Sequence, residues 1–151
     1  MRSVRNARDR AELLQRLRMI SPESRPRWGR MSAHQMVCHL GDICRVSLGE
    51  RRTTPVGNPL AHTVIKYFLL GGLPIPKGVP TTPELDQERQ GTAPADFDAD
   101  VRTLEELLER IGTAGSLPDA HEHPFFGPLS TSQWGRFHYR HMDHHLRQFG
   151  V

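Results

Sequence analysis

The sequence predicts an all-α fold, a four-helix bundle with a long, partly helical crossover between the second and third helices. Three observations predict this fold. Four segments repeat apolar residues at helical spacing, and no segment alternates apolar and polar residues over a useful length. About 45 residues rich in proline and glycine separate the second segment from the third. The 151 residues, 36% of them apolar, are enough for one domain that spans residues 1–151.

The first predicted helix covers about residues 6–20, with leucines on one side and arginines on the other, and Ser21-Pro22 ends it. The second begins near Ser32, the expected N-cap, because Gln35 follows three residues later as in a capping box. This helix extends to about Gly49, since glycine commonly follows a helix end.

The third predicted helix covers about residues 96–111. Three aspartates give its first turn the negative charge that the helix dipole favours, and Gly112 follows its expected end. The fourth begins at Ser130, where Gln133 completes a second capping box, and reaches about Gln148.

The connection between the second and third helices is long for a small domain. Residues 61–70 predict a short apolar helix, and the proline-rich remainder is expected to be irregular. So long a connection usually crosses over the bundle or shapes a site. The apolar residues 67–73 could also cover a helix of a second copy, so a homodimer stays open beside a monomer.

The net charge of +3 does not indicate a nucleic-acid partner, because the charges are segregated. Residues 1–30 hold nine arginines and three acidic residues, whereas residues 84–110 hold nine acidic residues and three arginines. Such complementary segments are expected to face each other or solvent rather than form one groove. No helix-turn-helix, zinc-finger spacing or aromatic-basic RNA motif is recognisable either.

Membrane and secreted locations are not indicated. The first 20 residues interleave arginines with acidic residues, unlike a signal peptide. The most apolar stretch, residues 64–76, contains Lys66 and two prolines and is too short to span a bilayer. Cys38 and Cys44 point in different directions on one predicted helix, so we expect reduced thiols in a cytoplasmic protein without a membrane partner.

Histidines on the fourth predicted helix are the most informative feature of the sequence. On a helical wheel the inward face carries Trp134, Phe137, His138, His141, His144, His145 and Phe149. The opposite, solvent-facing side carries Arg136, Arg140, Asp143 and Arg147. His141 and His145 lie one turn apart, and such a pair can direct two imidazole nitrogens to one metal ion if another helix supplies a third ligand.

The second predicted helix offers this third ligand. His39 lies at the border of its buried face, whereas His34 lies on the wetter side. His39, His141 and His145 would leave one position of a metal ion open for water or substrate. The alternative is a set of core histidines satisfied by hydrogen bonds, although burying several imidazoles together without a metal is costly.

Other candidates have weaker support. His138 and His144 are read as further ligands, as groups that support the ligands, or as structural residues. Cys38 is poorly placed as a ligand, Cys44 is expected in the core, and Asp42 is read as a solvated carboxylate or as a group that orients an imidazole. The histidines expected at the surface or at a pocket rim are His62, His121 and His123.

Several motifs carry a family resemblance that spans nearly the whole chain. The run WGRMSAHQMVCHL at residues 28–40 resembles the second-helix signature of a branch of the DinB-like superfamily, whose members are mostly of unknown function. The run HPFFGPLSTSQWGRFHYRHMDHHLRQFGV at residues 123–151 resembles the end of the same branch. LPIPKG at residues 73–78 and ADFD at residues 95–98 are similar as well.

This resemblance implies a DinB-like four-helix bundle in which three histidines hold a divalent metal. The matching residues are His39 in the second helix and the pair His141 and His145, followed by Gln148, in the last helix. Relatives include enzymes that transfer low-molecular-weight thiols and enzymes described as metal-dependent hydrolases, and many are dimers. His138, His144 and the Phe-Gly-Val ending are not general features of the superfamily, so the resemblance does not identify the activity.

The leading functional hypothesis is a metal-dependent enzyme that acts on a small molecule. Zinc is the first choice of metal, with nickel or iron as alternatives, and its water would make the protein a hydrolase. His138 or His144 would then serve as the acid or base. The alternatives are a metal-dependent transferase of low-molecular-weight thiols and a non-catalytic bundle that binds a metal or a small molecule.

Overall fold

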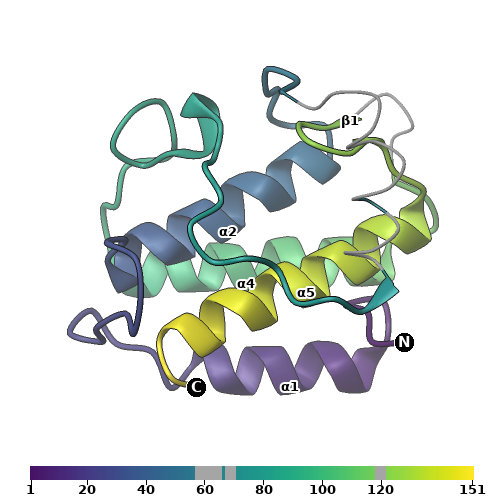
Figure 1. The fold of residues 1–151 in the computed structure, drawn as a ribbon. Helices are drawn as coiled ribbons and strands as arrows, with labels where there is room; N and C mark the ends of the chain where they lie inside the picture. The colour runs from purple at the N-terminus through teal and green to yellow at the C-terminus, as the bar shows by residue number, and fades with distance from the viewer. Residues whose placement is uncertain (57–65, 67–70, 118–121) are drawn as a thin grey trace.

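A computed structural model describes residues 1–56, 66, 71–117 and 122–151. Within these residues the chain is mostly helical, with four α-helices and a small two-stranded sheet (Figure 1). The helices are α1 (Ala7–Leu17), α2 (Ala33–Ser47), α4 (Phe97–Thr113) and α5 (Thr131–Gln148). The 3₁₀ helix η2 (Pro83–Leu85) lies in the crossover, and the strands β1 (Glu122–His123) and β2 (Gly127–Pro128) precede α5. The helix predicted at residues 61–70 lies outside the described residues, except for Lys66.

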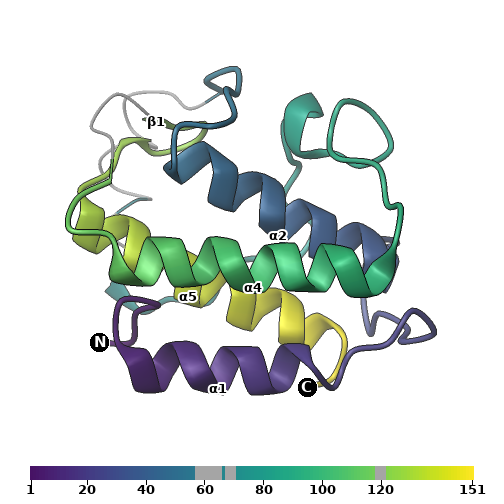
Figure 2. The ribbon, with the colours of Figure 1, turned by 180° about the vertical axis from the view of Figure 1, so that it is seen from behind.

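The four helices enclose a common core. Helices α4 and α5 lie between α2 and α1, and each of them contacts both. Helix α5 is in front of α4 in Figure 1, and α4 is in front in Figure 2, which shows the molecule from behind. The two ends of the chain lie at opposite ends of α1 (Figures 1 and 2). Two segments outside the helices are hydrogen-bonded to α5. Before α1, the backbone N–H of Val4 donates to the carbonyl of Gly135 at 3.1 Å, and between α1 and α2 the backbone N–H of Arg27 donates to the carbonyl of Gln148 at 2.7 Å.

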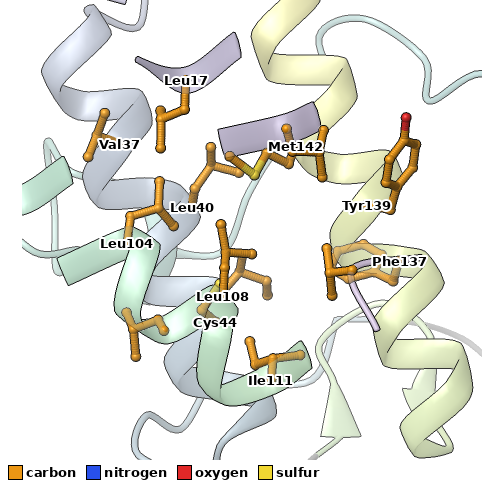
Figure 3. Packing of buried hydrophobic residues seen from close by; sticks show 14 of the residues in the cluster. Leu17, Val37, Leu40, Cys44, Leu104, Leu108, Ile111, Phe137, Tyr139 and Met142 are labelled. Atoms are coloured by element: carbon orange, nitrogen blue, oxygen red, sulfur yellow. The ribbon is translucent and has the colours of Figure 1, made fainter. Parts of the chain in front are cut away.

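Apolar side chains from every helix fill this core. Figure 3 shows Leu17 of α1, Leu40 of α2, Leu108 of α4 and Met142 of α5 turned toward one another. Cys44 is buried among them, as predicted. Each large apolar side chain buried in this way contributes about 1.5–3 kcal/mol, so the core supplies the main force that holds the helices together.

The helix starts follow the predicted caps. Ser32 and Ser130 each form a complete capping box, with Gln35 and Gln133 as the reciprocal partners. The side chain of Asp96 accepts a hydrogen bond from the third residue after it, which confirms the start of α4. Side-chain hydrogen bonds of this kind satisfy N–H groups that have no partner within the helix, which explains why the starts are predictable.

The end of α4 differs from the prediction. Gly112 lies inside the helix, which continues to Thr113. A side chain at Gly112 would collide with Arg10, since an added Cβ would lie 2.4 Å from its Nη1. Arg10 itself is buried rather than solvent-facing, because its guanidinium donates to the carbonyl of Val4 at 2.6 Å and pairs with Glu109 at 2.9 Å.

Strands β1 and β2 form a two-residue antiparallel pairing that the sequence did not predict. The pairing turns His123 inward, where its ring stacks on Phe126 at 4.3 Å and meets the edge of Phe137 at 4.4 Å. His123 was expected at the surface or at a pocket rim; it is 5% exposed, so the surface expectation is wrong, and it lines a cavity of the structure. Burial lowers the pKa of its imidazole to about 3.

The described helices are all too short or too polar to cross a membrane.

Candidate metal centre

Three imidazole rings from two helices meet at one point. His39 comes from α2, and His141 and His145 come from successive turns of α5. The Nε2 atom of His141 lies 3.3 Å from Nε2 of His39 and 3.1 Å from Nε2 of His145. One ring nitrogen of each lies within 4.8 Å of the other two. The structure therefore brings together the three predicted ligands as a group that could hold a metal ion.

Hydrogen bonds on the far sides of two rings select the nitrogen that faces this point. The Nδ1–H of His39 donates to the backbone carbonyl of Leu85 at 2.8 Å. The Nδ1–H of His145 donates to Oε1 of Gln148 at 2.8 Å. A neutral imidazole carries one N–H, so Nε2 of both rings is left with a lone pair directed at the shared point.

This arrangement fits a cation better than a set of hydrogen bonds. His141 can donate one N–H at most, so the three converging Nε2 atoms cannot all be satisfied by one another. A tetrahedral zinc ion with nitrogen ligands at about 2.0–2.1 Å separates those nitrogens by about 3.3–3.4 Å. The observed separations of 3.1 and 3.3 Å are close to this value.

The surroundings keep the three rings neutral, which is the state that binds metals. Burial lowers the pKa of His39, and it lowers the pKa of His145 to about 3. The pKa of His141 lies well below its usual value because the ring is desolvated and faces the other two imidazoles. Its Nδ1 atom is buried and has no hydrogen-bond partner among the described residues.

The loop before α2 holds the Gln148 side chain in position. The Nε2–H of Gln148 donates to the carbonyl of Trp28 at 2.8 Å, which leaves Oε1 to accept from His145. Gly29 follows with φ of +74°, and an added Cβ there would lie 2.9 Å from Nε2 of Gln148. Glycine is therefore required both for the backbone conformation and for the close approach of the amide.

A buried carboxylate holds the segment that contacts His39. Asp42 is fully buried, contrary to the expectation of a solvated group. It accepts hydrogen bonds from Gln87 at 3.0 Å, from the backbone and hydroxyl of Thr92 at 2.8 and 2.6 Å, and from Arg51 at 2.6 Å. These hydrogen bonds hold the turn after η2 against α2. As a result, the carbonyl of Leu85 lies beside the His39 ring.

A cavity of about 860 Å³ opens beside the three rings. Its walls combine apolar and aromatic residues of the loop before α2, the crossover and the sheet with polar groups of α5. The lining includes Trp28, Val79, Phe125, Phe137, His144 and Gln148. The size suits a small organic ligand.

The two candidate acid or base residues lie in different surroundings. His144 lines the cavity, with its ring edge-on to Trp28 at 5.8 Å, and burial lowers its pKa. His138 instead points into the core, where its Nε2–H donates to Ser47 at 2.8 Å and its Nδ1 lies 3.8 Å from the thiol of Cys44. Burial lowers the pKa of His138 to about 3. Geometry therefore favours His144 over His138 as a group that meets a ligand.

A second group of potential ligands lies between α2 and the first turn of α4. His34 contacts Asp100 of α4 through Nε2 and Oδ2 at 2.7 Å, so it is partly buried rather than exposed. The thiol of Cys38 lies 3.7 Å from the same carboxylate oxygen, and burial raises its pKa to about 12. Asp100 also accepts the backbone N–H of Ala95, so a structural link between the two helices accounts for this group. The remaining histidines of the sequence, His62 and His121, lie outside the described residues.

One residue of the cavity wall was missed by the sequence analysis. Arg140 was assigned to the solvent-facing side of its helix, yet it lines the cavity. The crossover covers this side of α5 (Figure 1), and the Arg140 guanidinium donates to the carbonyl of Leu73. No pattern within the helix indicates this contact, because the covering segment is distant in sequence.

Comparisons with known proteins identify a family but no characterised relative. The comparisons with curated proteins and with solved structures found no match. The family described as "Protein of unknown function (DUF1569)" matches residues 4–150, which is nearly the whole chain. The chain therefore belongs to the DUF1569 family of proteins of unknown function.

Proposed function

We propose that this protein is a metal-dependent enzyme that acts on a small molecule, with a hydrolytic reaction as the first expectation and a four-helix bundle of the DinB-like type as its fold. One observation carries the proposal. Three neutral imidazoles converge at the wall of a cavity of about 860 Å³, and the described residues supply no fourth protein ligand to this group. Catalytic metal sites keep such an open position, whereas structural sites are closed by protein ligands.

The protein side chains have separate tasks in this proposal. His39, His141 and His145 hold the metal through Nε2, while Leu85 and Gln148 accept the Nδ1–H groups and fix two of the rings. A zinc ion bound there supplies Lewis-acid chemistry and lowers the pKa of water, with nickel or iron as the other candidates. His144 lines the same cavity and would exchange a proton with the substrate at a ring nitrogen.

Metal analysis of protein purified without a histidine tag tests the centre. We expect about one equivalent of metal in the wild type, and a loss of that metal in both His39→Ala and His141→Ala. His34→Ala is the matched control, because His34 lies on the same helix as His39 but contacts Asp100 instead. Unchanged metal content in the first two variants would refute the centre.

Activity requires a separate test. The zinc-loaded protein is assayed with panels of esters, amides and lactones, and with electrophiles in the presence of low-molecular-weight thiols. We expect turnover that disappears in His141→Ala and persists in His34→Ala. Stoichiometric metal without turnover in any panel would contradict an enzyme and favour a binding module. Turnover that occurs only when a thiol is present would indicate a thiol transferase and not a hydrolase.

A further inference from the structure

The charged residues around the cavity are not balanced. Asp86 pairs with Arg89 at 3.5 Å, and Glu88 approaches Arg30 at 4.0 Å, so these four lining residues compensate one another. Arg140 lines the same cavity and forms no ion pair with any residue that the structure describes. Among the residues of the wall that the structure describes, one positive charge is therefore uncompensated.

The acidic residue nearest to Arg140 along the helix is already engaged. Asp143 accepts from Arg16 at 2.8 Å and from Arg147 at 3.0 Å, which ties it to α1 and to its own helix. Within the described part of the chain, the only hydrogen-bond acceptor of Arg140 is the carbonyl of Leu73, which accepts from Nη2. Its Nε–H is buried and has no partner among the described residues. A buried guanidinium N–H without an acceptor is costly, so a ligand that supplies one would be bound favourably.

We infer that Arg140 is a binding residue for the anionic group of the substrate, and that the substrate is a small organic anion with an apolar body. This inference rests on the proposed function, because it places the substrate in the cavity beside the three histidines. A carboxylate or phosphate oxygen would accept from the free N–H groups of Arg140, which is a charge-assisted hydrogen bond.

The apolar residues in the rest of the cavity wall are the reason to expect an apolar part in the substrate. Trp28, Ile43, Phe125 and Phe137 line the cavity, and such rings and aliphatic groups favour an uncharged hydrocarbon surface. His144 lies one helical turn after Arg140 and also lines the cavity. The anionic group and the apolar body would thus be bound by different parts of one cavity.

A matched pair of probes tests this inference. Binding of phenylacetate and of its neutral analogue phenylacetamide is measured by ligand-detected NMR, with wild type, Arg140→Gln and Arg140→Lys. Arg136→Gln is the control, since Arg136 lies one turn earlier on the same side of α5 and does not line the cavity. Each variant is measured both zinc-loaded and after chelation, because a carboxylate can also bind a metal directly.

We expect the chelated wild type and Arg136→Gln to bind phenylacetate about 10-fold or more tightly than phenylacetamide, which is the range of a charge-assisted hydrogen bond. Arg140→Gln should remove this preference, and Arg140→Lys should retain part of it. If Arg140→Gln still binds phenylacetate more tightly than phenylacetamide, the inference is overturned. If the preference for phenylacetate occurs only in the zinc-loaded protein, the anion binds the metal and not Arg140, which also overturns the inference. A preference that depends on Arg140 in a protein without stoichiometric metal would support the anion site while the proposed function fails.

Discussion

At the three histidines, the hydrogen bonds on the outer edges of the His39 and His145 rings matter as much as the convergence of the Nε2 atoms. The acceptors are a backbone carbonyl for His39 and an amide oxygen for His145. These acceptors favour one tautomer and one ring orientation before a metal arrives. The preorganised lone pairs explain why we expect substantial metal affinity from only three protein ligands.

Substitution of Gln148 tests the role of this outer contact. Gln148→Leu removes the acceptor of His145, and we expect zinc affinity to fall about 10- to 100-fold. Gln148→Glu keeps an acceptor but loses the donor that binds the carbonyl of Trp28. Competition titration with a zinc chelator should therefore rank the wild type above Gln148→Glu and Gln148→Leu last. Equal affinities would contradict the positioning role.

A second prediction at the scale of one residue concerns stability in acid. The pKa of His123 is about 3 in the folded protein and about 6.5 when unfolded, so the unfolded chain binds an additional proton between these values. Its contribution to stability is complete above about pH 6.5 and decreases as the pH falls toward 3. At pH 5 this single group costs about 2 kcal/mol relative to pH 7.

His123→Asn should flatten this dependence by about that amount, as measured by urea unfolding at pH 7 and pH 5 in the presence of a chelator. Phe126→Leu is the control, because it weakens the same stacking contact without removing a titratable group. We expect the control to lose stability by similar amounts at both pH values. An unchanged pH dependence in His123→Asn would show that this imidazole accepts a proton in the folded state.

At the scale of elements, the crossover is held on α2 by one buried carboxylate. Asp42→Asn removes the charge opposite Arg45 and Arg51 and weakens the five hydrogen bonds that the carboxylate accepts. We expect a loss of about 2–3 kcal/mol in the free energy of unfolding, because a positive charge is left without its partner. Zinc affinity should fall about 10-fold as well, since the turn positions the acceptor of His39.

Chemical unfolding and zinc titration of the same variant measure both effects. Asp98→Asn is the control, because Asp98 is exposed in the first turn of α4 and is expected to change stability by less than about 0.5 kcal/mol. Normal zinc affinity in a destabilised Asp42→Asn protein would separate the crossover from the metal centre and refute the proposed connection.

The loop between α1 and α2 supports α5 through a glycine. Gly29→Ala combines a strained positive φ with a collision at Gln148, whereas Gly78→Ala has the same φ of +74° and nothing within 4 Å. Both variants should be destabilised by about 1 kcal/mol because of the backbone conformation. Only Gly29→Ala should also weaken zinc binding, by about 10-fold. Similar zinc affinities in the two variants would contradict this role of the loop.

At the scale of the whole molecule, local signals predicted the helices and the inward histidines. Caps such as Ser32 and Ser130 act within a few residues, and apolar periodicity places His141 and His145 on the core side of α5. The metal-binding role of these residues stays a prediction, although the structure brings their nitrogens together.

The residues that sequence analysis misplaced depend on distant segments. Asp42 is buried because the turn after η2 folds over it, and His123 is buried because a two-residue strand pairing turns it inward. Arg140 lines the cavity because the crossover covers its side of α5 (Figure 1). Helical periodicity describes the environment within one element and carries no information on which distant loop covers its surface.

If three imidazoles hold a metal ion with an open position, zinc X-ray absorption spectroscopy will detect them. We expect one equivalent of zinc with three imidazole nitrogens at about 2.0–2.1 Å and one further oxygen or nitrogen. The imidazole signal should disappear in His141→Ala and remain in His34→Ala. A sulfur ligand at about 2.3 Å would contradict the three-histidine centre, because it would place the zinc at Cys38 beside Asp100 instead.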